Sequence, residues 1–550
     1  MPHGHLPHKT GISRCFQAPE ILQLICAQLP IDRTSDRQRL LAFALSCKAI
    51  LEPALDRLWF KIPSFRPIMT TLPADLWKAE RKPGPNSNRY TLLTLQRAVT
   101  AVDLERYIAY YSYRIREVEI GILKATFSAE AWQGLQLATR WTPGALSPSA
   151  QRVAWSLTTA KQVAVPQDAL NQAFPYFSLF LGPATTRVQF TFDSGVPIHA
   201  ASIMTAPDIP LKLKRLKLKD FATYSATTPF AGTYLQSSSW DNLEVLRLAN
   251  IPESAISHLS TLPRLASLEF WRLSMQPRHT YTQEHIERPP GHLGAMADNG
   301  FRSLETLRVT GDKGDDVVAF LQHLSPKNRL RVLKCTLSDH FVDIDHLILT
   351  IRLHCNPDYL RKLVVKGSPG QLPTSYEESL NITVDGGLTI RPLEAFNQLQ
   401  TLSINLQSAV NLTVDDIAHI IVSFSNLIKL KIDTRILDSR FPTIDHNQLL
   451  ELMYNLPNLK KLGLRFNATQ ITGDEVKPES TIRNLPPAIE KLWVADSPIY
   501  SPDAVGRFLA KHCPKLRTSN VIHPQLDHNA MPSYVPLAVY HRRWKAVGIQ

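Results

Sequence analysis

A six-residue phrase recurs along the chain and restricts its fold more than any other feature. The phrase reads apolar, two variable residues, apolar, one variable residue, apolar, as in LEVLRL at 243–248. Its last four residues alternate apolar and variable positions, which predicts a short, half-buried strand. Weaker copies lie at 115–120 and 185–190. The ten clear copies begin at Leu213, Leu243, Leu265, Leu304, Leu330, Leu360, Leu399, Leu427, Leu459 and Ile489.

Helix-like stretches separate the copies, whose starts lie 22 to 39 residues apart. The stretches at 315–324, 413–424, 445–456 and 501–513 have apolar residues at helical spacing, and several begin with Asp, Ser or Thr as a candidate N-cap. A strand and a helix repeated about every 30 residues predict an α/β leucine-rich repeat solenoid, a horseshoe with its strands on the concave face. A doubly wound α/β domain is the main alternative, but ten copies are too many for one such sheet.

Three apolar segments near the N-terminus predict three short helices. Pro19 suits the first turn of the first helix, which carries an apolar stripe that includes Ile21, Leu22 and Ile25. Ser35 and Gln38 have the spacing of a capping box for the second helix. So small a unit cannot bury its apolar surface alone, so we expect its helices to rest on the repeats or on a partner.

The segment from about Phe16 to Ile62 resembles an F-box, the motif that docks on the Skp adaptor of cullin–RING ubiquitin ligases. The resemblance is carried by PEIL (19–22), LLAFALSCK (40–48) and PALDRLWFKIP (53–63). Residues 97–120 and the closing YHRRWKAVGIQ are similar to segments of fungal F-box proteins with degenerate leucine-rich repeats. The resemblance implies a substrate-recognition subunit with no enzymatic activity of its own, bound through the Skp adaptor to a cullin.

The resemblance also implies which residues contact the adaptor, although some of them must instead form the module's own core. These residues are Pro19, Ile21, Leu22, Ile25, Leu41, Leu45, Cys47, Lys48 and Leu55. An alternative is that the three helices only cap the first repeat of a scaffold unrelated to ubiquitin. A cap would bury these helices against the repeats, whereas an F-box would leave an apolar face exposed.

Alternation within each strand places the third and fifth residues of every phrase on the concave surface. Ten of these twenty positions are Lys or Arg, so much of the net charge of +13 points to one face. The predicted substrate-binding residues are Arg215, Lys217, Arg247, Arg308, Lys334, Lys362, Lys429, Lys431, Lys461 and Lys491, with Trp493 as a candidate aromatic anchor. Such a face favours an acidic or phosphorylated protein segment. The alternatives are a nucleic-acid backbone, or lysines that only keep the sheet soluble.

Other motifs indicate neither catalysis nor a cofactor. The cysteines and histidines between Cys335 and Cys355 lack zinc-ligand spacing, and phosphate-binding glycine loops are absent. We interpret Asp315 or Asp316 as a helix cap rather than a metal ligand. Six scattered cysteines, with neither a secretory signal nor a long apolar window, are typical of a cytosolic or nuclear protein with no membrane span.

The predicted domain organisation follows from these features. Residues 1–15 form a disordered tail, 16–65 the F-box and 66–96 a connector rich in proline and basic residues. The solenoid extends over 97–525, and 526–550 form a C-terminal tail. Insertions around 275–300 and 367–392 are expected as loops on its rim.

Overall fold

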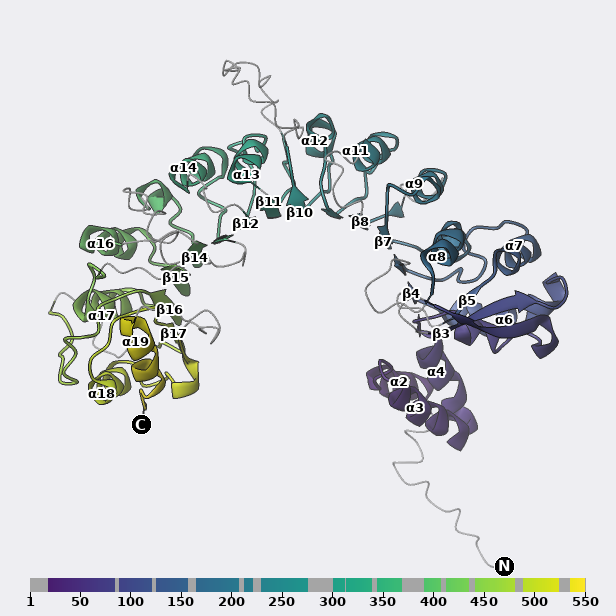
Figure 1. Cartoon of the computed structure of the whole chain (residues 1–550), viewed down its shortest axis with the longest axis horizontal. Coiled ribbons are helices and arrows are strands. Elements are labelled where there is room, and N and C mark those ends of the chain that lie inside the picture. The colour runs from purple at the N-terminus through teal and green to yellow at the C-terminus, as the bar shows by residue number, and fades with distance from the viewer. Residues whose placement is uncertain are drawn as a thin grey trace, which may run out of the picture. The chain divides into compact units, whose positions relative to one another are not determined.

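The computed structural model divides the chain into two compact units, Met1–Arg247 and Leu248–Gln550, each of which is described by itself. In each unit, helices lie along one side of a row of strands (Figure 1). The predicted N-terminal tail and most of the two predicted rim loops lie outside the described residues. The structure describes residues 18–84, 89–120, 125–156, 165–206, 212–220, 229–275, 300–311, 313–338, 344–367, 390–406, 412–434, 441–479, 488–523 and 535–549.

The first unit opens with three helices, as predicted: α2 (Pro19–Gln28), α3 (Thr34–Ser46) and α4 (Lys48–Trp59). Pro19 occupies the first turn of α2. The predicted capping pair Ser35 and Gln38 is wrong, because α3 starts one residue before Ser35. Its N-cap is Arg33, whose backbone N–H donates to Asp36 Oδ2 at 3.3 Å. The small core between the helices consists of Leu22, Cys26, Ile31, Leu40, Ala44, Ile50 and Ala54.

Residues 66–96 were predicted as a connector, and the structure differs there. They form α5 (Arg66–Met69), the 3-10 helix η1 (Ala74–Leu76) and the antiparallel pair β2 (Trp77–Pro83) and β3 (Arg89–Leu95). The strand β5 (Ala125–Phe127) joins β3 in a three-stranded sheet. The apolar residues of this segment supply the reason, because Leu76 and Leu93 are buried, as is Phe127 on the neighbouring strand β5.

A parallel sheet forms the rest of the first unit. Its strands run in the order β1 (Lys61–Ile62), β4 (Glu117–Ile120), β6 (Arg152–Ser156), β7 (Arg187–Phe192), β8 (Arg215–Asp220) and β9 (Val245–Leu248), and the last residue of β9 is the first residue of the second unit. The helical segments are α6 (Ala101–Tyr110), η3 (Ser112–Arg114), α7 (Ala129–Ala138), α8 (Gln167–Ala173), η4 (Phe174–Phe180), α9 (Pro197–Met204) and α11 (Pro229–Gln236). The two weak copies of the phrase are confirmed as strands β4 and β7.

The second unit continues the strand–helix alternation of a solenoid. All ten clear copies of the phrase, including those at β8 and β9, are confirmed as strands that begin at the third residue of the phrase. Leu307, Leu333 and Leu363 are paired in register and fully buried, and equivalent leucines follow on later strands. The remaining strands are β10 (Ser267–Leu273), β11 (Thr306–Gly311), β12 (Val332–Leu337), β13 (Lys362–Gly367), β14 (Thr401–Leu406), β15 (Lys429–Thr434), β16 (Lys461–Leu464), β17 (Lys491–Trp493) and β18 (Val521–Ile522).

Polar N-caps start several helices of this unit, as the sequence predicts. Thr413, Asp445 and Ser501 each accept a backbone N–H of the following turn. The predicted cap at Asp315 or Asp316 is wrong, because α13 starts at Gly314 and both acids lie in its first turn. The helical segments are α12 (Glu253–Ser260), α13 (Gly314–Leu321), α14 (Ile344–His354), η5 (Arg391–Ala395), α16 (Val414–Ser423), α17 (His446–Asn455), α18 (Pro502–His512), η6 (Thr518–Asn520) and α19 (Val535–Lys545).

The predicted C-terminal tail also differs from the structure, because its described part contains the helix α19. Trp544 on α19 is buried, and its indole N–H donates to the Ser497 carbonyl at 2.8 Å. The Trp544 ring lies 6.1 Å from the Phe466 ring, and Arg543 donates to the Ile499 carbonyl at 2.9 Å. The helix therefore covers apolar surface of the last repeats.

The buried cysteines of this protein should be slow to alkylate. Burial raises the pKa of Cys335 and of Cys513 to about 12 and raises that of Cys355, whereas Cys47 is exposed. Because the thiolate is the reactive species, iodoacetamide at pH 8 is expected to modify Cys47 in the native protein and to leave the three buried thiols unmodified until unfolding. Peptide mass spectrometry checks this, and rapid native modification of Cys335 would contradict it.

Candidate functional site

The first candidate surface consists of apolar side chains on α2 and α3 that point away from the small core. On α2, Ile21, Leu24 and Ile25 are 40%, 66% and 42% exposed. On α3, Leu41 and Leu45 are 47% and 74% exposed. Their i, i+3 and i+4 spacings give each helix an exposed apolar stripe beside its buried one. We call these five residues the apolar surface.

The structure shows which of the residues that the F-box resemblance assigns to adaptor contact are buried and which are exposed. Leu22 does not fit that assignment, because its side chain is only 1% exposed and forms part of the small core. Leu24 was missed, although its position three residues after Ile21 places it on the same stripe. Leu55 is half-buried, and the other members are exposed: Pro19, Ile21, Ile25, Leu41, Leu45, Cys47 and Lys48.

The last helix of the three is attached to the first repeat. The buried guanidinium of Arg114, on η3, donates to the carboxylates of Glu52 and Asp56 on α4. The Trp59 ring, at the end of α4, lies 4.5 Å from the Tyr111 ring. These contacts fix α4 on the repeats, whereas the apolar surface lies on α2 and α3.

The second candidate surface is the basic face of the second unit's sheet. Third-position residues pair in register across β13 to β17, which brings Lys362, Lys429, Lys461 and Lys491 into one row interrupted by Thr401. The fifth-position row contains Arg308, Lys334 and Lys431. Lys366 on β13 was missed, because it lies one residue after the end of its six-residue phrase. Arg215, Lys217 and Arg247 occupy β8 and β9 of the first unit.

Trp493 lies where the two lysine rows approach each other. The ammonium nitrogens of Lys429, Lys431 and Lys491 lie 5.2, 5.3 and 4.9 Å from the centre of its ring. Gly463 sits between Lys431 and Trp493 in the register. A Cβ on Gly463 would lie 2.9 Å from Lys431 Cγ and 3.2 Å from Trp493 Cβ. The missing side chain therefore allows Trp493 and Lys431 to approach. We call these residues, together with Lys461, the Trp493 cluster.

Positive charge on this face is crowded. Partial burial lowers the pKa of Lys429, and the charges of Lys431, Lys366, Lys362 and Lys461 lower it further. The pKa of Lys334 is lowered by burial and then by Arg308, Lys362 and Lys366. Within the described ranges, no acidic side chain forms an ion pair with any of six lysines: Lys334, Lys362, Lys366, Lys429, Lys461 and Lys491.

Replacing Lys429 with methionine is therefore expected to stabilise the protein. The change keeps the aliphatic stem and removes one of several like charges, whose cross-strand repulsion costs about 0.2–1 kcal/mol. The folded-state pKa of Lys429 lies below its unfolded value, so the penalty in the wild type is present at pH 7 and disappears as pH rises towards about 10.4. Urea unfolding should show a gain at pH 7 that shrinks near pH 10. A loss of stability at pH 7 would contradict this account.

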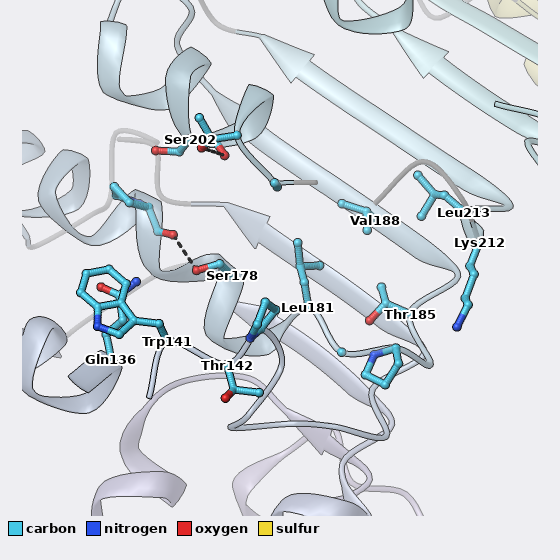
Figure 2. A pocket seen from close by; sticks show the side chains of 16 residues that line it. Gln136, Trp141, Thr142, Ser178, Leu181, Thr185, Val188, Ser202, Lys212 and Leu213 are labelled. Carbon is cyan, nitrogen blue, oxygen red and sulfur yellow. Dashed lines mark hydrogen bonds between the residues drawn. The ribbon is translucent and has the colours of Figure 1, made fainter. Parts of the chain in front are cut away.

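The first unit also contains a cavity of about 870 Å³ that the sequence did not predict. Figure 2 shows Trp141, Leu181, Val188 and Leu213 in its lining, together with Lys212. Trp141 is exposed and has a left-handed backbone, with φ of 58°. No local signal reveals this cavity, because its lining comes from loops, helical segments and the strand β7, which are distant in sequence.

Comparisons with known proteins add little to what the chain's own repeat pattern indicates about its fold. No family model and no curated protein match the chain. Among solved structures, an LRR protein of Leptospira interrogans is 13% identical, covers 68% of this chain and 72% of its own, and gives a TM-score of 0.31. An internalin of Listeria monocytogenes is 14% identical, covers 74% and 87%, and gives 0.31. At these TM-scores neither likeness carries a conclusion, so the repeat architecture rests on the strand register described above.

The described part of the chain contains neither a candidate membrane span nor a candidate metal site. Its helices include none with the length and apolar character that a bilayer crossing requires. Its His, Cys, Asp and Glu side chains form no cluster suited to a metal ion.

Proposed function

We propose that this protein is a substrate-recognition subunit of a Skp–cullin–F-box type ubiquitin ligase. In this proposal, α2 to α4 are the F-box, and the apolar surface docks on the Skp adaptor. The observation that carries the proposal is that α2 and α3 expose large apolar side chains although the small core between the three helices is already complete.

Energetic considerations support a partner for this surface. Fully burying a large aliphatic side chain contributes about 1.5–3 kcal/mol, and each of these five side chains, which are 40–74% exposed, would gain part of that before the costs of association. Large apolar side chains exposed on two helices of one small module are typical of a protein interaction site.

The repeats would hold the substrate in this proposal. The basic face of the second unit suits an acidic or phosphorylated segment, because charge-assisted contacts steer association and add specificity. The chain would contribute no chemical step of its own. Tethering a substrate beside a ubiquitin-loaded partner raises its effective concentration, which makes the transfer nearly intramolecular.

Calorimetric titration with a purified Skp adaptor tests the proposal. Wild-type protein is expected to bind, and Leu41→Asp with Leu45→Asp is expected to weaken binding by more than about a hundredfold, because two buried contacts become unpaired charges. A matched control is Val102→Asp with Leu137→Asp, which places the same charges at exposed apolar positions on α6 and α7. Wild-type protein that does not bind, or equal losses in both variants, would refute the proposed docking.

A repeat scaffold without a ubiquitin link is the second candidate. It is favoured by one observation, the contact of Arg114 with Glu52 and Asp56, which attaches α4 to the first repeat as a cap would be attached. If no Skp adaptor binds the well-folded protein, α2 to α4 are a cap and the repeats alone carry the interaction.

A further inference from the structure

We propose that the cavity of the first unit is a binding site for a fatty acid, an elongated apolar molecule with one carboxylate. The cavity is lined by the ends of α7, η4 and α9, by the segments that follow them and by the start of β7. Its volume of about 870 Å³ lies within the range of known ligand pockets, about 300–1,000 Å³. The inference goes beyond the proposed function and does not depend on it.

Close packing of two loops forms one wall of the cavity in advance of any ligand. Gly144 has a left-handed backbone, with φ of 70°, and a Cβ there would lie 2.2 Å from the Cα of Gly182. The Gly144 N–H donates to the Ser178 carbonyl at 2.8 Å, and the Leu146 N–H donates to the Leu179 carbonyl at 3.0 Å. Gly182 and Ser178 themselves line the cavity. Backbone contacts therefore hold this wall, so a ligand does not bear the cost of ordering it.

The backbone is strained where it carries Trp141 to the cavity. Arg140 and Trp141 are successive non-glycine residues in the left-handed region, with φ of 52° and 58°. Such residues cost free energy and cluster at ligand sites. Burial of the indole offsets little of this cost, because Trp141 is 62% exposed. The strain is explained if the indole covers one end of a bound ligand.

Hydroxyl groups in the lining already donate to the protein's own backbone. Thr185 donates to the Ala150 carbonyl at 2.9 Å, and Ser178 donates to the Pro175 carbonyl at 3.3 Å. Thr205 donates to a carbonyl of α9 at 3.3 Å. Because a hydroxyl has a single proton to donate, these groups have none left for a ligand. The middle of the cavity therefore suits an aliphatic chain better than a sugar or a nucleotide.

One unpaired cation lies at the edge of the cavity. Figure 2 shows Lys212 on the opposite side of the cavity from Trp141, with Leu181 between them. Of the described residues in the lining, only Lys212 is charged. Within the described ranges Lys212 forms no ion pair, whereas Lys214 pairs with Glu244 at 3.2 Å. A carboxylate at Lys212 would gain a charge-assisted hydrogen bond, and its chain would extend along Leu181 towards Trp141.

The C-terminus of α7 opposes the reverse orientation. The last carbonyl groups of a helix carry partial negative charge, so a carboxylate beside them is disfavoured. Gln136, in the last turn of α7, and Trp141, just after the helix, lie at that end of the cavity. The apolar end of the ligand, and not its carboxylate, therefore faces Trp141.

Calorimetric titration of the full-length protein with decanoate tests the inference, with decanol as the uncharged control ligand. The wild type is expected to bind one decanoate per chain and to bind decanol more weakly. Lys212→Met keeps the aliphatic stem and removes the charge, so it should weaken decanoate binding about tenfold and leave decanol binding unchanged. Lys214→Met is the matched control, because Lys214 does not line the cavity, and it should leave both affinities unchanged.

Glycine at position 141 separates ligand binding from folding. Trp141→Gly should relieve the left-handed strain, so the variant is expected to resist urea at least as well as the wild type. It should nevertheless bind decanoate about fivefold more weakly, because the indole no longer covers the chain. Arg140→Gly relieves the same kind of strain at a residue outside the lining, so it should keep the wild-type affinity.

Four results would each overturn the inference. They are the absence of saturable decanoate binding, equal affinities of the wild type for decanoate and decanol, equal losses in the two lysine variants, and wild-type affinity in Trp141→Gly.

Discussion

Replacing Leu22 with aspartate is expected to unfold α2 to α4, whereas aspartate at the neighbouring Ile21 should leave them folded. Leu22 lies in the small core, and Ile21 is 40% exposed. An unpaired carboxylate in an apolar core costs several kcal/mol, and a core of seven small and medium side chains has little stability to lose. Amide hydrogen exchange of peptides from residues 19–59 measures the difference.

Equal protection of these peptides in both variants would show that the core is assigned wrongly. The comparison also guides the binding experiments. A variant that includes Leu22 loses the fold together with any contact, so pairs such as Leu41 and Leu45 are the informative ones.

Replacing Trp132 with alanine is expected to destabilise the first unit by about 3–5 kcal/mol. Trp132, on α7, is fully buried. Its ring lies 4.8 Å from the Phe65 ring and 4.9 Å from the Phe127 ring, both edge-on, and stacks on Tyr176 at 5.2 Å. The substitution would remove this packing and leave a cavity among α5, β5, α7 and η4. Urea unfolding, followed by hydrogen exchange of α7 peptides, measures the loss.

Trp132→Phe is the matched control, because it keeps an aromatic ring and should cost distinctly less than alanine. A loss below about 1 kcal/mol for Trp132→Ala would contradict the packing described here.

The phrase itself explains why the repeats could be predicted. Paired leucines such as Leu333 and Leu363 recur with their register intact, and local alternation is enough to place each strand. The sixth strand, β6, was missed because its copy of the phrase is degenerate, with Ala150, Val153 and Trp155 in place of leucines. Those three side chains are nonetheless buried, as the pattern requires.

Other segments of the fold could not be predicted from the local sequence pattern. Proline and basic residues suggested a connector at 66–96, but buried contacts of Leu76 and Leu93 with distant segments hold a hairpin there. The helix α19 is likewise held by tertiary contacts of Trp544 with Ser497 and Phe466. In such segments, packing overrides composition.

The two candidate surfaces also differ in how much of each could be predicted from the local sequence. Strand alternation was enough to place the lysines in rows that the strand register brings side by side, because side-chain direction in a strand is local. The Trp493 cluster depends on how three strands align and on the absent side chain of Gly463, neither of which is visible locally. On α2, the sequence grouped Ile21 with Leu22, and only the packing of three helices shows which of the two is exposed.

The most direct test of the proposed function is amide hydrogen exchange of the full-length protein with and without a purified Skp adaptor. The proposal predicts that the adaptor slows exchange within residues 19–46, which contain α2 and α3, and leaves the strands β10 to β17 unchanged. Absence of protection at residues 19–46, or protection confined to the repeats, would contradict it.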